Sequence, residues 1–358
     1  MSANRIAIAG IGAVAELHAL AVGDIDDAEV VAGSCRTESK GRKFAAEFDC
    51  TWYDDTEAML DAKEPDVLSV CTPSGAHLDP TLAAVERGVD VLCEKPLEIT
   101  TDRIDQMIAA AEANDVRLGG VFPQRYNPVV RTCYDAAREG RFGDLSVINA
   151  YVPWWRDDDY YEGAWQGTQA LDGGGALMNQ SIHGIDAIQW LAGASHDHDS
   201  GVNPVEEVFA YTATRAHEGD KIEVEDTAVA VLKFRNGAIG QVLGATSMYP
   251  GSLKRVQLGG HGGTAEILED ELVTWEFRES RPDDEEIRER FTETETGGGA
   301  ADPMDIDYSN HTRNIRDFLE SVENDEPYML DGAEARNAVE IIESIYESAE
   351  TGDSVRLK

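Results

Sequence analysis

Two side chains and one loop of this chain have the types and spacing needed to move a hydride. Lys95 lies two residues after the apolar run Val89–Cys93, and His183 falls in a later amphipathic segment. A lysine at the end of a buried strand can polarise a hydroxyl group, or donate a proton if burial lowers its pKa. A neutral histidine, with an ordinary pKa of about 6.5, can accept the hydroxyl proton. The pair predicts a dehydrogenase, against the alternatives of a surface lysine and a core histidine.

The loop is the glycine pattern that follows the first apolar run. Gly10, Gly12 and Ala15 match G-x-G-x-x-A, in which the glycines allow a tight turn and the approach of a pyrophosphate, and the alanine allows close helix packing. A structural turn is the alternative, but the position after an N-terminal strand favours dinucleotide binding. The predicted contacts are Gly10, Gly12, Ala13 and Val14.

The end of the second predicted strand bears on the choice of cofactor. An acid there binds the ribose 2′-hydroxyl of NAD, whereas arginine favours the 2′-phosphate of NADP. The chain reads Gly33-Ser34-Cys35-Arg36-Thr37, with three more cations by residue 43. We therefore expect NADP, with Ser34, Arg36 and Thr37 as phosphate contacts. NAD is the alternative, in which case these are ordinary solvated basic residues.

A group of aromatic and polar residues suits a sugar, which stacks on rings and hydrogen-bonds at its edges. The predicted substrate contacts are Arg125, Tyr126, Asn127, Trp154, Arg156, Trp165, Asn179 and His183. Trp155, Tyr160 and Tyr161 belong to the same cluster, about half of which should be core. No metal site is expected: His196-Asp197-His198-Asp199 is interpreted as a solvated loop.

Asn179, His183, Asp186 and Trp190 are spaced to share one face of a predicted helix over Gly175–Leu191. Asp186 either orients the imidazole of His183 or stabilises the local structure. The pattern does not separate these two roles.

The elements that position these residues fall into two sets. Up to residue 123, apolar strands alternate with helices, which predicts a parallel, doubly wound sheet with its ligand crevice at the carboxyl ends of the strands. The glycine loop, Thr72-Pro73, Lys95-Pro96 and Pro123-Gln124-Arg125 all lie at such ends.

After residue 123 the strands follow one another with short turns, which predicts an antiparallel sheet. The predicted strands are Val205–Thr214, Thr227–Phe234, Ile239–Thr246, Val256–Gly260, Thr264–Leu268 and Leu272–Glu276. Pro282–Asp302 is expected to be a mobile loop. We therefore predict an α/β chain with a Rossmann domain over 1–123 and a substrate-binding and oligomerisation domain over 124–358. The closing helices, about 310–349, are candidates to pack back on the first domain.

The charge of the chain is extreme, with 69 acidic against 30 basic residues and a formal net charge of −39. Such self-repulsion favours a salt-rich cytoplasm, as in halophilic archaea, over an ordinary acidic protein. It argues against nucleic acid and anionic membranes as partners. The sequence shows no signal peptide and no membrane helix. Its five cysteines lack disulfide spacing and are expected to be reduced and mostly buried, which indicates a cytoplasmic protein.

Taken together, the motifs resemble the glucose–fructose oxidoreductase, inositol dehydrogenase and rhizopine catabolism family (Gfo/Idh/MocA) over essentially the whole chain. The matching segments are Gly10-Ile11-Gly12 through His18, Thr72-Pro73 with His77, Glu94-Lys95-Pro96, Arg125-Tyr126-Asn127-Pro128, Asp172-Gly173-Gly174-Gly175 through Asp186, and Ser348–Gly352.

This resemblance implies a Rossmann domain followed by an α/β domain with a large, mostly antiparallel open sheet that builds homodimers or homotetramers. It implies transfer of hydride between a nicotinamide cofactor and a ring hydroxyl of a sugar or cyclitol. Lys95 and His183 correspond to the family's catalytic pair, and the Lys95–Pro96 bond is a candidate cis peptide. The cofactor contacts then extend to Thr72, Pro73, His77, Glu94 and Lys95.

Position 179 departs from the family pattern, because many members carry aspartate there. Asn179 cannot shuttle a proton, which leaves the acid–base work to Lys95 and His183. The setting is similar to the branch that oxidises the uronates of nucleotide sugars at carbon 3, with free sugars as the alternative. Two other classes stay open: a redox-neutral, glycosidase-like enzyme that holds NAD tightly, and a non-catalytic regulator that senses a dinucleotide.

Overall fold

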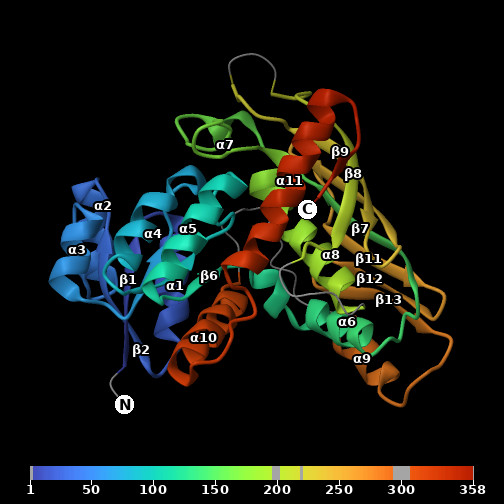
Figure 1. Cartoon of the computed structure of the whole chain (residues 1–358), viewed down its shortest axis with the longest axis horizontal. Helices are drawn as coiled ribbons and strands as arrows, with labels where there is room; N and C mark the ends of the chain where they lie inside the picture. The colour runs from blue at the N-terminus through green and yellow to red at the C-terminus, as the bar shows by residue number, and fades with distance from the viewer. Residues whose placement is uncertain (1–2, 196–201, 218–220, 293–306, 358) are drawn as a thin grey trace. The chain divides into compact units, whose positions relative to one another are not determined.

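The computed structural model describes residues 3–195, 202–217, 221–292 and 307–357, which form two compact units (Figure 1). The first unit comprises Met1–Pro123 and Asp307–Arg336, and the second comprises Gln124–Ile306 and Asn337–Lys358. The His196–Asp199 segment lies outside the described residues. None of the described helices is both long and apolar enough to span a bilayer.

The first unit is built on a parallel sheet of six strands in the order β3-β2-β1-β4-β5-β6. The strands are β1 Asn4–Ala9, β2 Ala28–Ser34, β3 Thr51–Tyr53, β4 Val67–Val70, β5 Asp90–Cys93 and β6 Leu118–Gly120. The strand order reverses beside β1, so the carboxyl ends of β1 and β4 flank a switch point where ligands bind in such sheets. This confirms the predicted Rossmann fold.

The helices of the first unit form two rows, because α1 packs on α10 whereas α3, α4 and α5 pack in sequence. They are α1 Ala13–Gly23, α2 Glu38–Glu47, α3 Thr56–Lys63, α4 Leu78–Val85, α5 Thr101–Asn114 and α10 Ser309–Asn324. Between the rows, every residue of β4 is buried, as parallel strands covered on both faces require.

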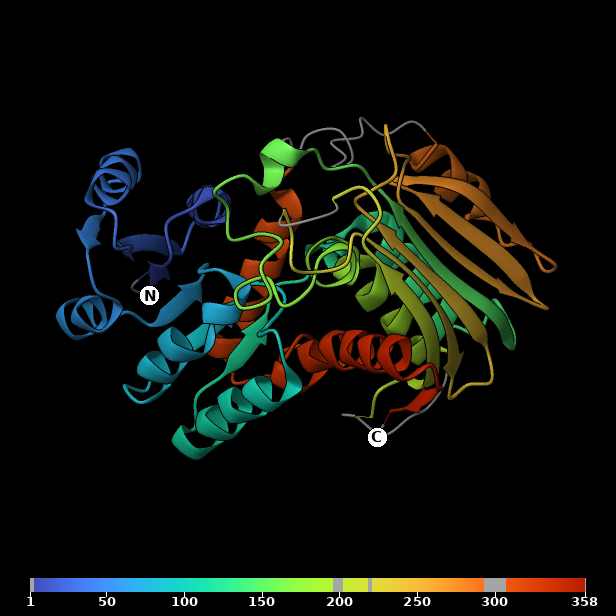
Figure 2. The ribbon, with the colours of Figure 1, turned by 90° about the horizontal axis from the view of Figure 1, so that it is seen from above.

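The second unit is built on an eight-stranded sheet in the order β13-β12-β11-β7-β10-β9-β8-β14, in which only β7 and β10 pair in parallel. The strands are β7 Leu145–Pro153, β8 Val205–Ala213, β9 Thr227–Phe234, β10 Ile239–Ala245, β11 Arg255–Gly260, β12 Gly263–Leu268, β13 Glu271–Phe277 and β14 Val355–Arg356. Buried and exposed side chains alternate along β9, because one face of the sheet is covered. Figure 2 shows α8 along that face.

The remaining helices described in the chain range from short turns to the long α11. They are η1 Ser74–Ala76, η2 Pro123–Tyr126, α6 Pro128–Arg138, α7 Asp158–Tyr161, η3 Ala176–Ser181, α8 Ile182–Ala194, α9 Asp284–Arg290 and α11 Gly332–Thr351. The prediction of a loop over 282–302 is wrong in part, because α9 forms there with three acids in its first turn and arginines in its last. Residues 293–302 of that segment lie outside the described residues.

The segment predicted as one α-helix from Gly175 to Leu191 consists of two helices. Ala176–Ser181 form a turn of π-helix, and the α-helix α8 begins only at Ile182. A π-helix bonds residue i to i+5, so it changes the angle between successive side chains. The prediction that Asn179 shares one regular helical face with His183 is therefore wrong, although both lie within two turns of each other.

Candidate active site

The glycine loop of the first unit is shaped for a close backbone approach. Gly10 has a φ of +90°, and a Cβ there would lie 2.6 Å from the amide nitrogen of Thr72. A Cβ on Gly12 would meet nothing within 4 Å, so the space in front of its backbone is open. Gly12 begins α1 without a side-chain cap, and the following Ala13 and Val14 are exposed. Uncapped N–H groups beside open space fit the pyrophosphate of a dinucleotide.

The residues predicted to choose the cofactor differ in exposure. Ser34 is buried, and its Oγ lies 2.8 Å from the Oγ1 of Thr56. Arg36 and Thr37 are exposed, and among the described residues no carboxylate pairs with Arg36. The nearby Arg42, in contrast, is held by Glu38 at 2.8 Å. Arg36 is thus the predicted phosphate contact with an accessible cation, whereas the hydroxyl of Ser34 supports the strand end.

His77 joins two of the loops that end strands of the sheet. Its ring is 1% exposed, its Nδ1 lies 2.9 Å from the carbonyl of Pro96, and its Nε2 lies 2.8 Å from the carbonyl of Thr72. Burial lowers the pKa of His77, although these carbonyls oppose the shift. His77 therefore connects the loop at Thr72 with the loop that contains Lys95. The Lys95–Pro96 peptide is cis, as predicted.

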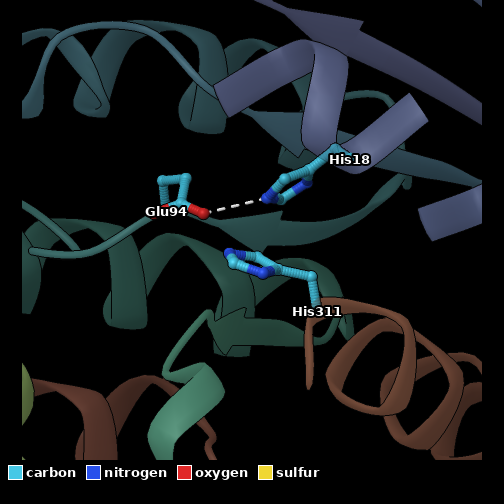
Figure 3. A group of neighbouring side chains, drawn as sticks. All are labelled: His18, Glu94 and His311. Carbon is cyan, nitrogen blue, oxygen red and sulfur yellow. Dashed lines mark hydrogen bonds and ion pairs between the residues drawn. The ribbon is translucent and has the colours of Figure 1, made fainter. Parts of the chain in front are cut away.

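Lys95 itself is half-buried, next to the fully paired carboxylate of Glu94. Oε2 of Glu94 accepts the backbone N–H of Lys95 at 3.0 Å, and Oε1 lies 2.9 Å from Nε2 of His18 (Figure 3). Despite burial, His18, His311 and Lys95 lower the pKa of Glu94 to about 2. Glu94 is thus an ionised, internal group that holds the lysine loop.

In the second unit, Arg125 forms a buried ion pair with Asp186. Nε and Nη2 of Arg125 donate to the two oxygens of Asp186 at 2.8 and 2.5 Å, and both side chains are 0% exposed. The guanidinium also stacks over Trp190 at 5.1 Å. Arg125 and Asp186 are therefore paired inside the second unit, and the contact of Arg125 with a substrate stays a prediction.

Asn127, a predicted substrate contact, is also internal. Its Oδ1 caps α6 by accepting the N–H of Val129 at 3.1 Å, and its Nδ2 donates to Asp270 at 2.6 Å. Tyr126, Trp165 and His183 are each partly buried.

Asn179 belongs to a chain of polar contacts within the second unit. Its Nδ2 donates to Asp172 at 2.7 Å, and its Oδ1 accepts from Gln180 at 3.2 Å. Gln180 in turn donates to the hydroxyl of Tyr160 at 2.9 Å and accepts from Arg156 at 3.1 Å. The structure therefore connects Asn179 and Arg156, two of the predicted substrate contacts, through groups that can bond a hydroxylated ligand.

Aromatic rings frame the guanidinium of Arg156. It lies 5.1 Å from the ring of Trp154 and 5.5 Å from the ring of Tyr160. Burial lowers the pKa of Arg156 and raises the pKa of Tyr160 to about 12. A cation held between two aromatic faces suits a sugar that carries an acidic substituent.

One residue that positions the site was not anticipated from the sequence. Glu225 is buried, and its carboxylate accepts the N–H groups of Gly175 and Leu177 at 3.0 and 2.8 Å and the hydroxyl of Tyr346 at 3.0 Å. A Cβ on Gly175 would lie 2.0 Å from the carbonyl of Glu225, which explains the glycine. Glu225 therefore fixes the start of η3, from which Asn179 and then His183 follow. Among the 69 acidic residues, Glu225 is marked only by Ile222 and Val224, which alternate with acids just before it.

Comparison with protein families gives two matches. Residues 4–121 match the model of an oxidoreductase family with an NAD-binding Rossmann fold (GFO_IDH_MocA), and residues 130–266 match a GFO/IDH/MocA C-terminal domain. Among curated proteins, the D-glucoside 3-dehydrogenase of Escherichia coli is 28% identical over 99% of this chain and 97% of its own length. The D-xylose 1-dehydrogenase (NADP(+)) 2 of Haloferax volcanii is 25% identical over 98% and 97%.

Among solved structures, the WlbA dehydrogenase of Bordetella pertussis, in complex with NADH and UDP-GlcNAcA, is 29% identical. It superposes with a TM-score of 0.88 over 100% of this chain and 98% of its own. A WlbA dehydrogenase from Chromobacterium violaceum, with the same two ligands, is 28% identical with a TM-score of 0.87.

Proposed function

The chain belongs to the Gfo/Idh/MocA family of oxidoreductases, and from this membership we propose that it oxidises a glycoside or a nucleotide-linked sugar at carbon 3 with a nicotinamide cofactor. The open glycine loop after β1, with Lys95 held after β5 of the same sheet, carries the proposal. The similarity to a D-glucoside 3-dehydrogenase and to a dehydrogenase crystallised with UDP-GlcNAcA supports the class of substrate.

Each proposed role follows from the chemistry of the side chain. The nicotinamide cofactor, whose pyrophosphate the glycine loop would hold, would supply the acceptor for the hydride. The ammonium of Lys95 polarises the reacting hydroxyl, and the imidazole of His183 accepts its proton. The side-chain amide of Asn179 does not ionise and cannot act as an acid or a base, so it orients the sugar through hydrogen bonds. The Arg156 guanidinium between Trp154 and Tyr160 recognises an acidic group such as the carboxylate of a uronate.

The test of this proposal is to monitor reduction of the cofactor in concentrated KCl by its absorbance. NAD and NADP are each paired with glucosides, free aldoses, inositols, free uronates and nucleotide-linked uronates. Turnover confined to glucosides or nucleotide-linked sugars, with a 3-keto product identified by mass spectrometry and NMR, is the expected result. Turnover with inositols or free aldoses alone would contradict it. So would bound cofactor without any turnover.

We further propose NADP as the cofactor. The exposed Arg36 and the following N-terminus of α2 offer a cation and backbone donors to a 2′-phosphate. The Haloferax relative is named for NADP, whereas the Bordetella structure holds NADH, so the proposal depends on Arg36 of this chain. Comparison of the dissociation constants of the two cofactors decides it.

We also propose that the chain forms a homodimer or homotetramer through the open face of the eight-stranded sheet. Four apolar side chains point from that face: Tyr211, Val229, Val231 and Ile239. Tyr211 pairs with Val229, and Ile239 pairs with Lys233, which lies two residues after Val231 and so points the same way. These side chains are between 37 and 69% exposed. In a chain with a net charge of −39, such an apolar surface suits a second copy of itself. Light scattering in KCl, with a Val231→Asp variant, measures the assembly.

Finally, we propose that the protein works in a salt-rich cytoplasm. The net charge of −39 and five free cysteines support this location. Two of the thiols are buried and three are partly exposed, fewer than the sequence predicted. The free energy of unfolding should rise from dilute buffer to molar KCl, as screening removes self-repulsion. A protein that is most stable at low ionic strength would contradict this proposal.

A further inference from the structure

Three buried titratable side chains face one another inside the first unit, apart from the open glycine loop. They are His18 on α1, Glu94 after β5 and His311 on α10 (Figure 3). Their exposed fractions are 0, 7 and 8%, and one donor atom from each lies within 4.8 Å of the others. Such a group requires an explanation, because a buried charge lowers stability unless it is paired.

The hydrogen bonds connect this cluster to the backbone of Lys95. Nδ1 of His18 lies 2.7 Å from Oγ of Ser69, and Nε2 lies 2.9 Å from Oε1 of Glu94. The second oxygen, Oε2, accepts the N–H of Lys95 at 3.0 Å. Both oxygens of Glu94 are thus engaged, one by the imidazole of His18 on α1 and one by the backbone of Lys95. The position of His18 therefore sets the position of that loop.

The charges of the cluster fit an ion pair beside a neutral ring. Burial opposes the charge on His18, but Cys71 and Glu94 outweigh it and raise the pKa of His18 to about 10. Burial and the neighbouring cations His18 and Lys95 lower the pKa of His311 to about 4. At neutral pH these shifts favour an imidazolium at His18 beside the carboxylate of Glu94, with His311 uncharged.

We propose that His18 is a positioning residue for Lys95: its imidazolium fixes the carboxylate of Glu94, which fixes the backbone of the lysine. This inference rests on the proposed dehydrogenase function, in which Lys95 is catalytic. His311 closes the pair from α10 with its ring 5.9 Å from that of His18 and adds no charge. In the same loop, the carbonyl of Pro96 lies 2.9 Å from Nδ1 of His77. Two histidines from different elements thus contact one short loop, His18 through Glu94 and His77 directly.

A metal ion is the competing occupant of two histidines and a glutamate. A metal ion would have to replace the hydrogen bond between Nε2 of His18 and Oε1 of Glu94, because each ligand atom must be free of its proton. Oε2 of Glu94 is also committed to the backbone of Lys95. Both observations favour the ion pair.

The experiment compares His18→Gln with His311→Gln in the full chain. Glutamine at 18 can still donate to Glu94 but carries no charge, whereas His311 has no hydrogen bond to Glu94 among the described residues. We expect His18→Gln to lower kcat about tenfold to a hundredfold with little change in the cofactor KM, because small misplacements of a catalytic group have effects of this size. His311→Gln should stay within about threefold of the parent.

The pH profile separates positioning from general destabilisation. The charged and titratable groups facing Glu94 are His18, His311, Lys95 and His77, and Cys71 and Asp307 lie near the two cluster histidines. Without the imidazolium of His18, burial raises the pKa of Glu94. His18→Gln should therefore gain an acid limb in kcat near neutral pH that the parent lacks. An unchanged kcat and pH profile, or an equal loss in His311→Gln, would overturn the proposal.

A second measurement needs no turnover and no variant. In the parent chain labelled with ¹⁵N in its imidazoles, NMR should find one histidine with both ring nitrogens protonated until the pH approaches about 10. If no histidine keeps both protons at alkaline pH, the ion pair is wrong. Loss of turnover on treatment with EDTA, with recovery on adding zinc, would also overturn it. If the parent shows no turnover with any sugar, the proposed function fails, and the NMR result still decides the state of the cluster.

Discussion

The two units hold their candidate site residues by different means. In the first, Lys95 is held through its own backbone, by Glu94 next to it and by contacts among loops at the ends of neighbouring strands. In the second, Asn179 lies in a π-helical turn and His183 follows it, and the start of that turn is fixed by Glu225, about 50 residues later in the chain. One support is local to the sheet edge, and the other comes from the loop that precedes β9.

This difference follows from the two kinds of sheet. A parallel sheet brings the carboxyl ends of its strands to one edge whatever side chains they carry, so residues after each strand meet there. An antiparallel sheet offers no such edge, and the second unit relies on particular buried carboxylates instead. Asp186 is neutralised by Arg125, whereas the described partners of Glu225 are backbone N–H groups and a tyrosine hydroxyl. Burial accordingly raises the pKa of Glu225.

The sharpest test of the comparison is removal of the reacting group from the first unit. Lys95→Ala should lower kcat by about a hundredfold or more, since a positioned acid or cation contributes on that scale. Cofactor binding should persist, because the glycine loop binds the pyrophosphate through its backbone N–H groups. Stopped-flow turnover and fluorescence titration of the cofactor measure the two effects. The control is Lys43→Ala, an exposed lysine at the edge of α2. Unchanged turnover in Lys95→Ala would remove this lysine from the mechanism.

A second prediction concerns the charges that support the first unit. The lowered pKa of Glu94 means that its stabilising effect is complete above about 4.5 and is lost as the pH falls towards about 2. The raised pKa of His18 means that its effect is complete below 6.5 and is lost as the pH rises towards about 10. The parent should therefore exceed His18→Gln in free energy of unfolding most between these limits, by about 3 kcal/mol. Urea titrations in KCl across the pH range measure this difference. A constant difference at every pH would contradict the ion pair.

The first unit could be predicted from the sequence because its signals are local. The alternation of apolar strands with helices up to residue 123 predicted the parallel sheet, and Gly10 has the positive φ that its motif requires. The short strand β3 gives no such signal, since three residues of strand show no periodicity.

The second unit shows where the sequence signal ends. Alternation predicted Thr227–Phe234 with its observed bounds, because one covered face imposes a period of two. The same reasoning failed at η3, where contacts with Glu225 override the regular period of the helix. Nor does the sequence show that Asp186, 61 residues away, lies against Arg125.

A change of a single atom in Glu225 tests how this residue supports the second unit. Glu225→Gln keeps the size of the side chain but replaces one acceptor oxygen by an N–H₂ group, which must face a backbone N–H of Gly175 or Leu177. A buried donor left without an acceptor lowers stability by about 1–3 kcal/mol. We expect a loss of that size, with kcat reduced about tenfold as Asn179 and His183 shift. Glu223→Gln, at an exposed acid two residues earlier, is the matched control. If both variants behave alike, Glu225 does not position the site.

The smallest expected effect returns to the first unit, at the end of β2. Replacing Cys35 by Asp and Arg36 by Ala exchanges a cation for an acid where the ribose of the cofactor is expected. Loss of one charge-assisted contact should weaken NADP about tenfold, and the new carboxylate should strengthen NAD. Because Arg36 is exposed and Ser34, which supports the strand, is unchanged, stability should stay within about 0.5 kcal/mol. Calorimetric titration with each cofactor measures both affinities. An unchanged affinity for NADP would show that the residues at the end of β2 do not select between NAD and NADP. Local sequence signals would then predict the fold of this unit but not its cofactor.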